Sequence, residues 1–251
     1  MNYKTFWLPP NAEYVEYIVN DSLVNKFFEV NNPDRKEIVI NVPDGCVNIW
    51  FLFKHNKCHA RIVGSGIEGV RSMVSDTEKC FGVKFNAGVL PIKLMDEDKC
   101  IMNENYALNQ YINVEELEHL MEKSESPEDR MQVFTDYSDR FGTVMADQIT
   151  QMVIQYINEK NGNADIKVMA DELGYCQQYL SRVFKKMVGM PMKQYARIVR
   201  TQYAFSQIKK EPTAEICDVL GYYDQPHFIK EFKKYSMMTP NEAYNTAYHF
   251  V

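Results

Sequence analysis

Residues Ala170–Gly189, ADELGYCQQYLSRVFKKMVG, and residues Gly221–Pro240, GYYDQPHFIKEFKKYSMMTP, decide how the C-terminal part of this chain folds. The two stretches belong to an internal repeat, because Met169–Tyr175 matches Ile216–Tyr222 at an offset of 47 residues. Each copy contains a Leu-Gly-Tyr triplet, and glycine favours a sharp turn after a short helix. We therefore expect a helix that stops at the glycine of each copy.

The match continues beyond the turn. Phe184-Lys185-Lys186 matches Phe232-Lys233-Lys234 at an offset of 48 residues, so the second copy has one extra residue just after its turn. A short helix, a tight turn and a second helix make a helix-turn-helix unit. Met192–Ile208 lies between the copies and predicts one long helix that joins two such units.

The second helix of a helix-turn-helix lies in the major groove of DNA, where its early residues reach the base edges. Glutamine can pair with adenine and arginine with guanine, while lysine contacts phosphates. We expect one apolar side of each helix to pack, namely Tyr179, Leu180, Val183, Phe184 and Met187 in the first and Phe228, Ile229 and Phe232 in the second. The predicted DNA contacts are Gln177, Gln178, Ser181, Arg182, Lys185, Gln225, His227, Lys230, Lys233 and Lys234.

Asp224, His227 and Glu231 would share one face of a helix, which raises a metal or acid/base site as an alternative. Asp224 is better explained as the N-cap of the second recognition helix, since aspartate is a preferred capping residue. Pro226 is tolerated in a first turn, where amide hydrogens lack helical partners. His227 then projects from the end of the helix that meets DNA, and Glu231 is a charge on its flank.

The charge is unevenly distributed along the 251 residues, whose net charge is −6. From Asn163 to Val251 there are 12 Lys and Arg against 9 Asp and Glu, whereas the preceding 162 residues have 16 against 25. An acidic front half and a mildly basic back half indicate two domains with different partners. A purely structural helical repeat is the alternative, but a spacer does not require a repeated Gly-Tyr turn and a repeated Phe-Lys-Lys.

The segment from about Thr143 to Tyr248 resembles the DNA-binding domain of AraC/XylS-family transcription regulators, on the two stretches quoted above. The resemblance implies two helix-turn-helix units on a shared linker helix, entering successive major-groove faces on one side of the duplex. It implies base contacts from Gln178, Ser181, Arg182, Gln225, His227 and Lys230. Where the family usually has glycine after the second recognition helix, this chain has Met237, which puts the local geometry there in doubt.

The front half predicts strands, because short apolar runs alternate with glycine and proline. Val42–Ile49 (VPDGCVNI) is similar to a stretch in the N-terminal domains of one subgroup of these regulators, with Asn48 where aspartate is usual. We expect an α+β protein: a β-rich, sandwich or barrel-like regulatory domain with trailing helices over residues 1–141, and an all-α DNA-binding domain over residues 143–251.

Three helices are expected before the helix-turn-helix units, two at the end of the first domain and one at the start of the second. Asn113–Lys123 has helical apolar spacing, and Ser126-Pro127 predicts a capped helix that runs to Phe141. A third helix is expected at Thr143–Lys160. The resemblance implies that the helices before Gly142 mediate a homodimer, although they would serve equally well as packing elements of one subunit.

Aromatic residues in the predicted strands are candidates to line an apolar effector cavity, or else belong to the plain core: Trp50, Phe53, Phe81 and Phe85. His55, Cys58 and His59 are a candidate metal site, but their polar surroundings favour an ordinary hairpin. A bifunctional metal enzyme or a DNA-repair module with a four-cysteine zinc site is the alternative function. Cys46, Cys58, Cys80 and Cys100 lack the short-spaced pairs of such a site, so neither a metal nor a cofactor is expected.

The expected partners are double-stranded promoter DNA, RNA polymerase, a small-molecule effector and a second copy of the chain. No stretch approaches the roughly 20 apolar residues that span a bilayer, and the cysteine spacing gives no disulfide framework. A cytoplasmic, non-enzymatic regulator of transcription is therefore the expectation.

Overall fold

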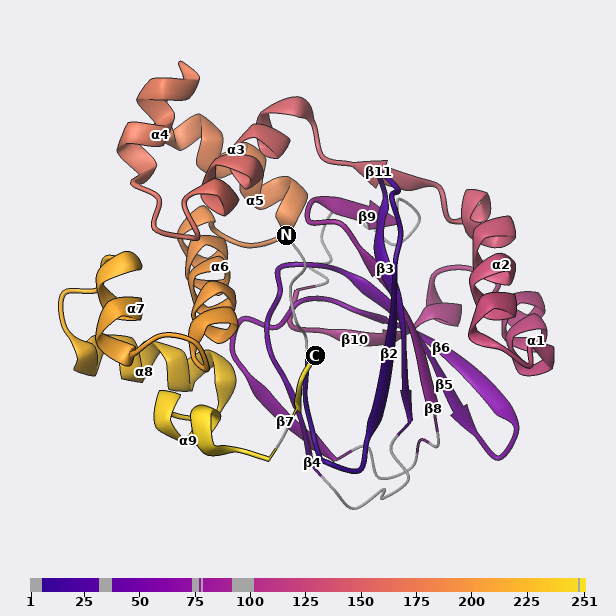
Figure 1. Ribbon diagram of the computed structural model, residues 1–251. Helices are drawn as coiled ribbons and strands as arrows, with labels where there is room; N and C mark the ends of the chain where they lie inside the picture. The colour runs from indigo at the N-terminus through magenta and orange to yellow at the C-terminus, as the bar shows by residue number, and fades with distance from the viewer. Residues whose placement is uncertain (1–5, 32–37, 74–76, 78, 92–101, 248) are drawn as a thin grey trace.

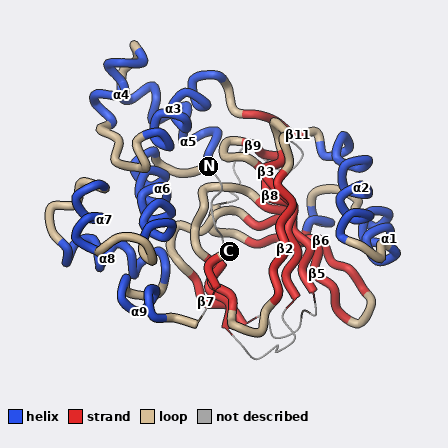
Figure 2. The backbone as a smooth tube through the Cα atoms, in the orientation of Figure 1, coloured by secondary structure: helices blue, strands red, loops and turns tan. Residues whose placement is uncertain are grey.

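The computed structural model describes residues 6–31, 38–73, 77, 79–91, 102–247 and 249–251. Strands form the middle of the molecule, with two helices on one side and the remaining helices on the other (Figures 1 and 2). The expected α+β architecture, a β-rich part followed by an all-α part, is confirmed. The division at residues 141 and 143 stays a prediction.

The β-rich part contains two main sheets. The six-stranded sheet has the order β10-β6-β5-β8-β3-β2, and the four-stranded sheet has the order β12-β1-β4-β7. Their bounds are β1 (Phe6–Leu8), β2 (Glu13–Ile18), β3 (Val24–Asn31), β4 (Ile38–Asn41), β5 (Asn48–Lys54), β6 (Lys57–Val63), β7 (Val70–Met73), β8 (Lys79–Phe85), β10 (Asn105–Ala107) and β12 (His249–Phe250). All the pairings within them are antiparallel.

Side-chain alternation gives the six-stranded sheet two apolar faces. On β5, Ile49 and Phe51 face one core, in which Phe134 of the following helices also lies. Trp50 points the other way and packs against Phe6 of the four-stranded sheet, with ring centroids 5.7 Å apart. Both faces of this sheet are therefore covered, one by helices and one by the second sheet.

Two helices cover the outer face of the six-stranded sheet, α1 (Glu115–Lys123) and α2 (Pro127–Ser138). The Ser126 hydroxyl accepts the amide N–H of Asp129, and the Asp129 carboxylate accepts that of Ser126, which confirms the expected helix start. A single 3-10 turn, η3 (Asp139–Phe141), follows and ends at Gly142 in the left-handed conformation.

The helix expected at Thr143–Lys160 begins later than the sequence indicated. Residues 143–145 form β11 (Thr143–Met145), which pairs with β9 (Val89–Pro91), and α3 (Gln148–Glu159) starts only after Asp147. The Asp147 carboxylate accepts the Thr150 amide at 2.9 Å and caps that helix. A tertiary strand pairing outweighs the helical pattern here, and β-branched Thr143 and Val144 fit it.

The helix-turn-helix prediction is confirmed twice over. The helices are α4 (Ile166–Leu173), α5 (Gln177–Val188), α6 (Met192–Gln207), α7 (Thr213–Val219), α8 (Gln225–Ser236) and α9 (Pro240–Asn245). Gly174 and Gly221 take φ values of +74° and +66° at the two turns, which explains glycine at both places. The long helix α6 joins the two units, as expected.

The helical part packs against the four-stranded sheet. Trp7 lies in one apolar cluster with Phe205 of α6, their ring centroids 5.8 Å apart, and Ile40 of β4 belongs to the same cluster as Phe228 of α8. At the end of the chain, β12 returns to pair with β1. The core of the second helix-turn-helix unit is thus completed by strands from the front of the chain.

Candidate nucleic-acid interface

Helix α5 presents a polar face to solvent because its apolar residues follow helical spacing. Leu180 and Phe184 are fully buried against α3 and α6, whereas Tyr179, Val183 and Met187 are half-buried. The residues expected to contact DNA are all exposed: Gln177, Gln178, Ser181, Arg182 and Lys185. The Arg182 guanidinium lies 5.6 Å from the Tyr179 ring, which limits its freedom before any contact with DNA.

Helix α8 begins as its sequence indicated. The Asp224 carboxylate accepts the amide N–H of His227 at 2.8 Å, and Pro226 lies in the first turn. The expected contacts Gln225, His227 and Lys230 are exposed, as is Lys233. Phe228 and Phe232 are buried as expected, but the expectation that Ile229 packs is wrong. Ile229 is 36% exposed, because it lies on the outer side of α8 rather than toward α6.

Glu231 has a structural partner and is not arranged as a metal ligand. Its carboxylate accepts the Tyr222 hydroxyl at 2.6 Å and lies 3.6 Å from Nε of Arg197. Burial and the nearby Glu231 carboxylate raise the pKa of Tyr222, so the phenol stays protonated and donates. The interaction ties α8 to the preceding turn and to α6.

Lys234 differs from its neighbours in what it faces. Its ammonium group lies 2.9 Å from the Glu68 carboxylate of the β-rich part, and this hydrogen bond raises the pKa of Lys234. Lys234 is therefore partly engaged within the molecule, whereas no ion pair involves Lys230 or Lys233 in the described part of the chain.

A groove of about 410 Å³ runs beside α6 between the two units and is lined by Gln177 of α5 and His227 of α8. The starts of both recognition helices therefore border one depression. Its cationic lining was not foreseen from the sequence: Lys167, Lys193, Arg197 and Arg200. The i, i+4 spacing of Lys193 and Arg197 on the linker helix could have indicated it.

The two acids in this groove are occupied by local contacts, which leaves a positive surface. Asp165 caps α4 by accepting the amides of Lys167 and Val168 at 2.7 and 3.2 Å. Glu231 is held by Tyr222 and Arg197 as described. The ammonium groups of Lys167 and Lys193 are exposed, and no described acid lies within ion-pair distance of them.

The end of α8 shows how the chain accommodates Met237 where the family resemblance expects glycine. Met237 adopts φ +61°, in the left-handed region, and its amide donates to the carbonyl of Lys233. The helix therefore still ends by a left-handed residue. The Met237 carbonyl accepts a hydrogen bond from the Arg71 guanidinium of β7 at 3.3 Å, which ties the end of α8 to the β-rich part.

The Val42–Ile49 stretch lies at the junction of the two parts. Lys84 Nζ lies 2.8 Å from the Asp44 carboxylate, both side chains being buried, and the Gly45 amide donates to the Ser65 hydroxyl at 2.8 Å. The Gln202 side chain of α6 donates to the Pro43 carbonyl at 2.8 Å. The stretch is therefore held by buried contacts on one side and is hydrogen-bonded to the linker helix α6 on the other.

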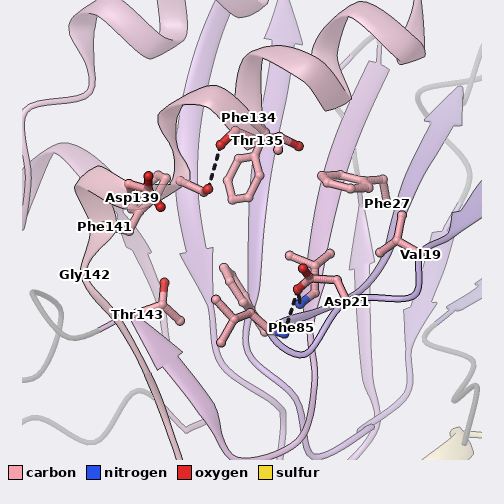
Figure 3. A pocket seen from close by; sticks show the side chains of 13 residues that line it. Val19, Asp21, Phe27, Phe85, Phe134, Thr135, Asp139, Phe141, Gly142 and Thr143 are labelled. Carbon is pink, nitrogen blue, oxygen red and sulfur yellow. Dashed lines mark hydrogen bonds between the residues drawn. The ribbon is translucent and has the colours of Figure 1, made fainter.

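The four aromatic candidates for an effector cavity do not share one face. Trp50 lies between the two sheets, whereas Phe53, Phe81 and Phe85 lie on the outer face toward α1 and α2. Phe81 and Phe85 are buried core residues. Phe85 also borders a pocket between the sheet and α2 (Figure 3).

The candidate metal ligands His55, Cys58 and His59 lie in different surroundings. His55 and Asn56 form a two-residue hairpin turn with positive φ values, His59 is exposed, and Cys58 is buried under α1. Within the described residues no group of three or more His, Cys, Asp or Glu is arranged to hold a metal. Burial raises the pKa of Cys46 to about 12, and Cys100 lies outside the described residues. No helix of the described chain is long and apolar enough to cross a membrane.

Comparisons with known proteins agree with this geometry. A family model described as a helix-turn-helix domain matches residues 169–245. The uncharacterized transcriptional regulatory protein YesN of Bacillus subtilis is 30% identical over 118 residues, which are 44% of this chain and 32% of that protein. Regulatory protein SoxS of Salmonella typhimurium is 30% identical over 98 residues, which are 38% of this chain and 92% of SoxS. The chain belongs to the AraC/XylS family.

Two further similarities of this AraC/XylS member differ in how much of the chain they cover. The F1 operon positive regulatory protein of Yersinia pestis is 35% identical over 96 residues, 36% of this chain and 31% of that protein. The chain spans about a third of the length of YesN and of the F1 regulator. Among solved structures, ToxT of Vibrio cholerae O395 matches 95% of this chain and 96% of its own, at 12% identity and a TM-score of 0.44, which is a distant likeness.

Proposed function

We propose that the protein is a sequence-specific, DNA-binding regulator of transcription that reads two successive major grooves with α5 and α8. The observation that carries this proposal is the single groove bordered by the starts of both helices and lined by exposed cations of α6. If α5 and α8 enter two major grooves from one side of a duplex, the DNA backbone between those grooves passes over this groove of the protein. Lys193 and Arg197 would then contact phosphates that lie between the two recognition helices, α5 and α8.

The base-reading residues we propose are those at the starts of the two helices. Gln178, Ser181 and Arg182 act in the first unit, and Gln225, His227 and Lys230 in the second. Gln177, Lys185 and Lys233 lie beside them and would contact the backbone. Lys234 is a weaker candidate because of its ion pair with Glu68.

We further propose that a signal received by the β-rich part is passed to DNA binding. Supporting contacts run directly from the Val42–Ile49 loop to α6 and from the Gly69 amide to the Lys234 carbonyl of α8. A small molecule or a protein could supply the signal. A second copy of the chain, bound through α1 and α2, and RNA polymerase are further proposed partners.

Footprinting on the DNA upstream of the coding region tests the DNA-binding proposal. Arg182→Ala and Lys230→Ala are each expected to weaken binding, and a lost base contact costs about 1–3 kcal/mol of discrimination at that position. Lys209→Ala is the matched control, because Lys209 is exposed beyond the end of α6 and away from the groove. Unchanged affinity and base preference in both test variants would overturn the assignment of recognition helices.

A further inference from the structure

A pocket of about 440 Å³ lies between the outer face of the six-stranded sheet and α2, where the chain leaves α2 for β11 (Figure 3). This volume is within the ordinary range of small-molecule sites. Its lining residues come from the β2–β3 turn, β3, β8, α2 and the segment Asp139–Thr143. The pocket is separate from the space between the two sheets and from the DNA-facing groove.

Phenylalanine rings form the bottom of the pocket. Phe134 is central, with its ring centroid 5.9 Å from that of Phe27, 6.4 Å from Phe85 and 5.5 Å from Phe141. All four rings are at most 4% exposed, so they form a packed apolar layer beneath the pocket, and the half-buried apolar side chains that line it are Val19, Leu23 and Val24. Such a bottom accepts an apolar or aromatic group, and aromatic rings also attract cations.

The mouth of the pocket is acidic. Asp21 and Asp139 are exposed on opposite sides of it, and no lysine, arginine or histidine is among the described residues that line it. One Asp21 oxygen is occupied by the amides of Leu23 and Val24 at 2.7 and 2.8 Å. The second oxygen of Asp21 accepts no hydrogen bond from the described residues.

The hydroxyl groups beside the mouth offer acceptors as well. Thr135 donates its hydroxyl proton to the Met131 carbonyl at 2.8 Å, and Ser138 donates to the Thr135 carbonyl at 2.7 Å. Because each hydroxyl uses its proton within the protein, its oxygen lone pairs remain as acceptors for a hydrogen bond from a ligand. Negative charge and acceptors without a basic residue favour an occupant that is a cation and a hydrogen-bond donor.

We propose that this pocket binds a small organic ammonium ion, with its apolar body against Val19, Leu23 and Val24 above the phenylalanine rings and its charged group between Asp21 and Asp139. The assignment of this ligand as an effector rests on the proposed regulatory function. Gly142 and Thr143 line the pocket; Thr143 is the first residue of β11, which is followed by α3. An occupant therefore touches the connection to the DNA-binding helices.

Titration calorimetry of the full chain with three probes of similar shape tests this proposal. Phenethylamine is expected to bind saturably, phenethyl alcohol more weakly, and phenylacetate not at all. Asp139→Asn is nearly isosteric and is expected to weaken the binding of phenethylamine about threefold to fivefold, the upper part of the range for an exposed charge pair, without changing the binding of the alcohol. Asp136→Asn is the matched control, since Asp136 is exposed on α2, three residues before Asp139, but does not line the pocket.

Three results would overturn the proposal: no saturable binding of phenethylamine, equal binding of phenylacetate, or the same affinity for the amine in Asp139→Asn and Asp136→Asn. Footprinting without any amine, on the same protein, tests DNA binding separately. Loss of amine binding with an intact footprint rejects the pocket alone, and a missing footprint rejects the DNA-binding proposal alone.

Discussion

At the scale of single residues, two glycines with the same φ value have different surroundings. Gly45 and Gly174 both have φ +74°. A Cβ at Gly45 would lie 2.5 Å from Cε2 of Tyr195 on α6, whereas a Cβ at Gly174 would meet nothing within 4 Å. The first glycine therefore permits a close approach between the two parts of the molecule, and the second permits only a turn.

The pair gives a matched prediction. Gly174→Ala is expected to lower the free energy of unfolding by about 1 kcal/mol, the cost of a left-handed alanine. Gly45→Ala pays the same conformational cost and adds a steric clash of about 1–3 kcal/mol. Urea unfolding followed by circular dichroism measures both. Equal losses in the two variants would show that Gly45 is needed only for its turn.

At the scale of elements, α1 protects one strand of the six-stranded sheet. The Glu122 carboxylate accepts the Cys58 amide at 2.9 Å, and the Glu118 carboxylate accepts the Ala60 amide at 2.7 Å. Two acids one helical turn apart thus satisfy N–H groups of β6 where its partner β10 has ended. The hydrogen bond from Cys58, with help from Lys57 and His119, lowers the pKa of Glu122.

This lowered pKa predicts a pH dependence. The pKa of Glu122 in the folded protein lies below its ordinary 4.5. The contribution of Glu122 to the free energy of unfolding is therefore fully present above pH 4.5 and is lost as the pH falls through the folded-state pKa. Glu122→Gln should be less stable than the wild type at neutral pH, and the difference should shrink on acidification. Glu115→Gln, exposed in the first turn of α1, is the control in the same urea titrations. If the difference in stability between the wild type and Glu122→Gln did not vary with pH, the stabilising role of the Glu122 carboxylate would be contradicted.

At the scale of the whole molecule, residues of both helix-turn-helix units and of α6 line one groove, which we propose as part of the DNA interface. If Lys193 and Arg197 contact phosphates, their removal should weaken binding to all sequences alike. The slope of log K against log salt concentration is expected to fall by about 0.9 for each lost contact. Equilibrium binding at several salt concentrations measures it for Lys193→Ala/Arg197→Ala, with Lys209→Ala/Lys210→Ala as the control. An unchanged slope would exclude the groove from the interface.

The sequence predicted local features well and long-range ones poorly. The turns at Gly174 and Gly221 and the caps at Ser126 and Asp224 depend on neighbours a few residues away, so their patterns identified them. The strand at Thr143–Met145 depends on pairing with β9, which no local pattern reveals.

The same limit applies to the sites. Exposed faces of α5 and α8 follow from helical spacing, and the predicted residues are exposed in the structure. The groove beside α6 and the pocket beside α2 each combine segments far apart in the chain. The sequence also could not distinguish core aromatics from pocket-lining ones, because side-chain alternation in a strand does not show which of two covered sheet faces contains a pocket.

The pairing of β12 with β1 has a consequence for synthesis of the protein on the ribosome. β1 is made before the DNA-binding helices, whereas its partner residues His249 and Phe250 are made after them. One edge of β1 therefore stays open during translation, while β4 can already pair with its other edge. The four-stranded sheet therefore closes only after the helices of the DNA-binding part have emerged.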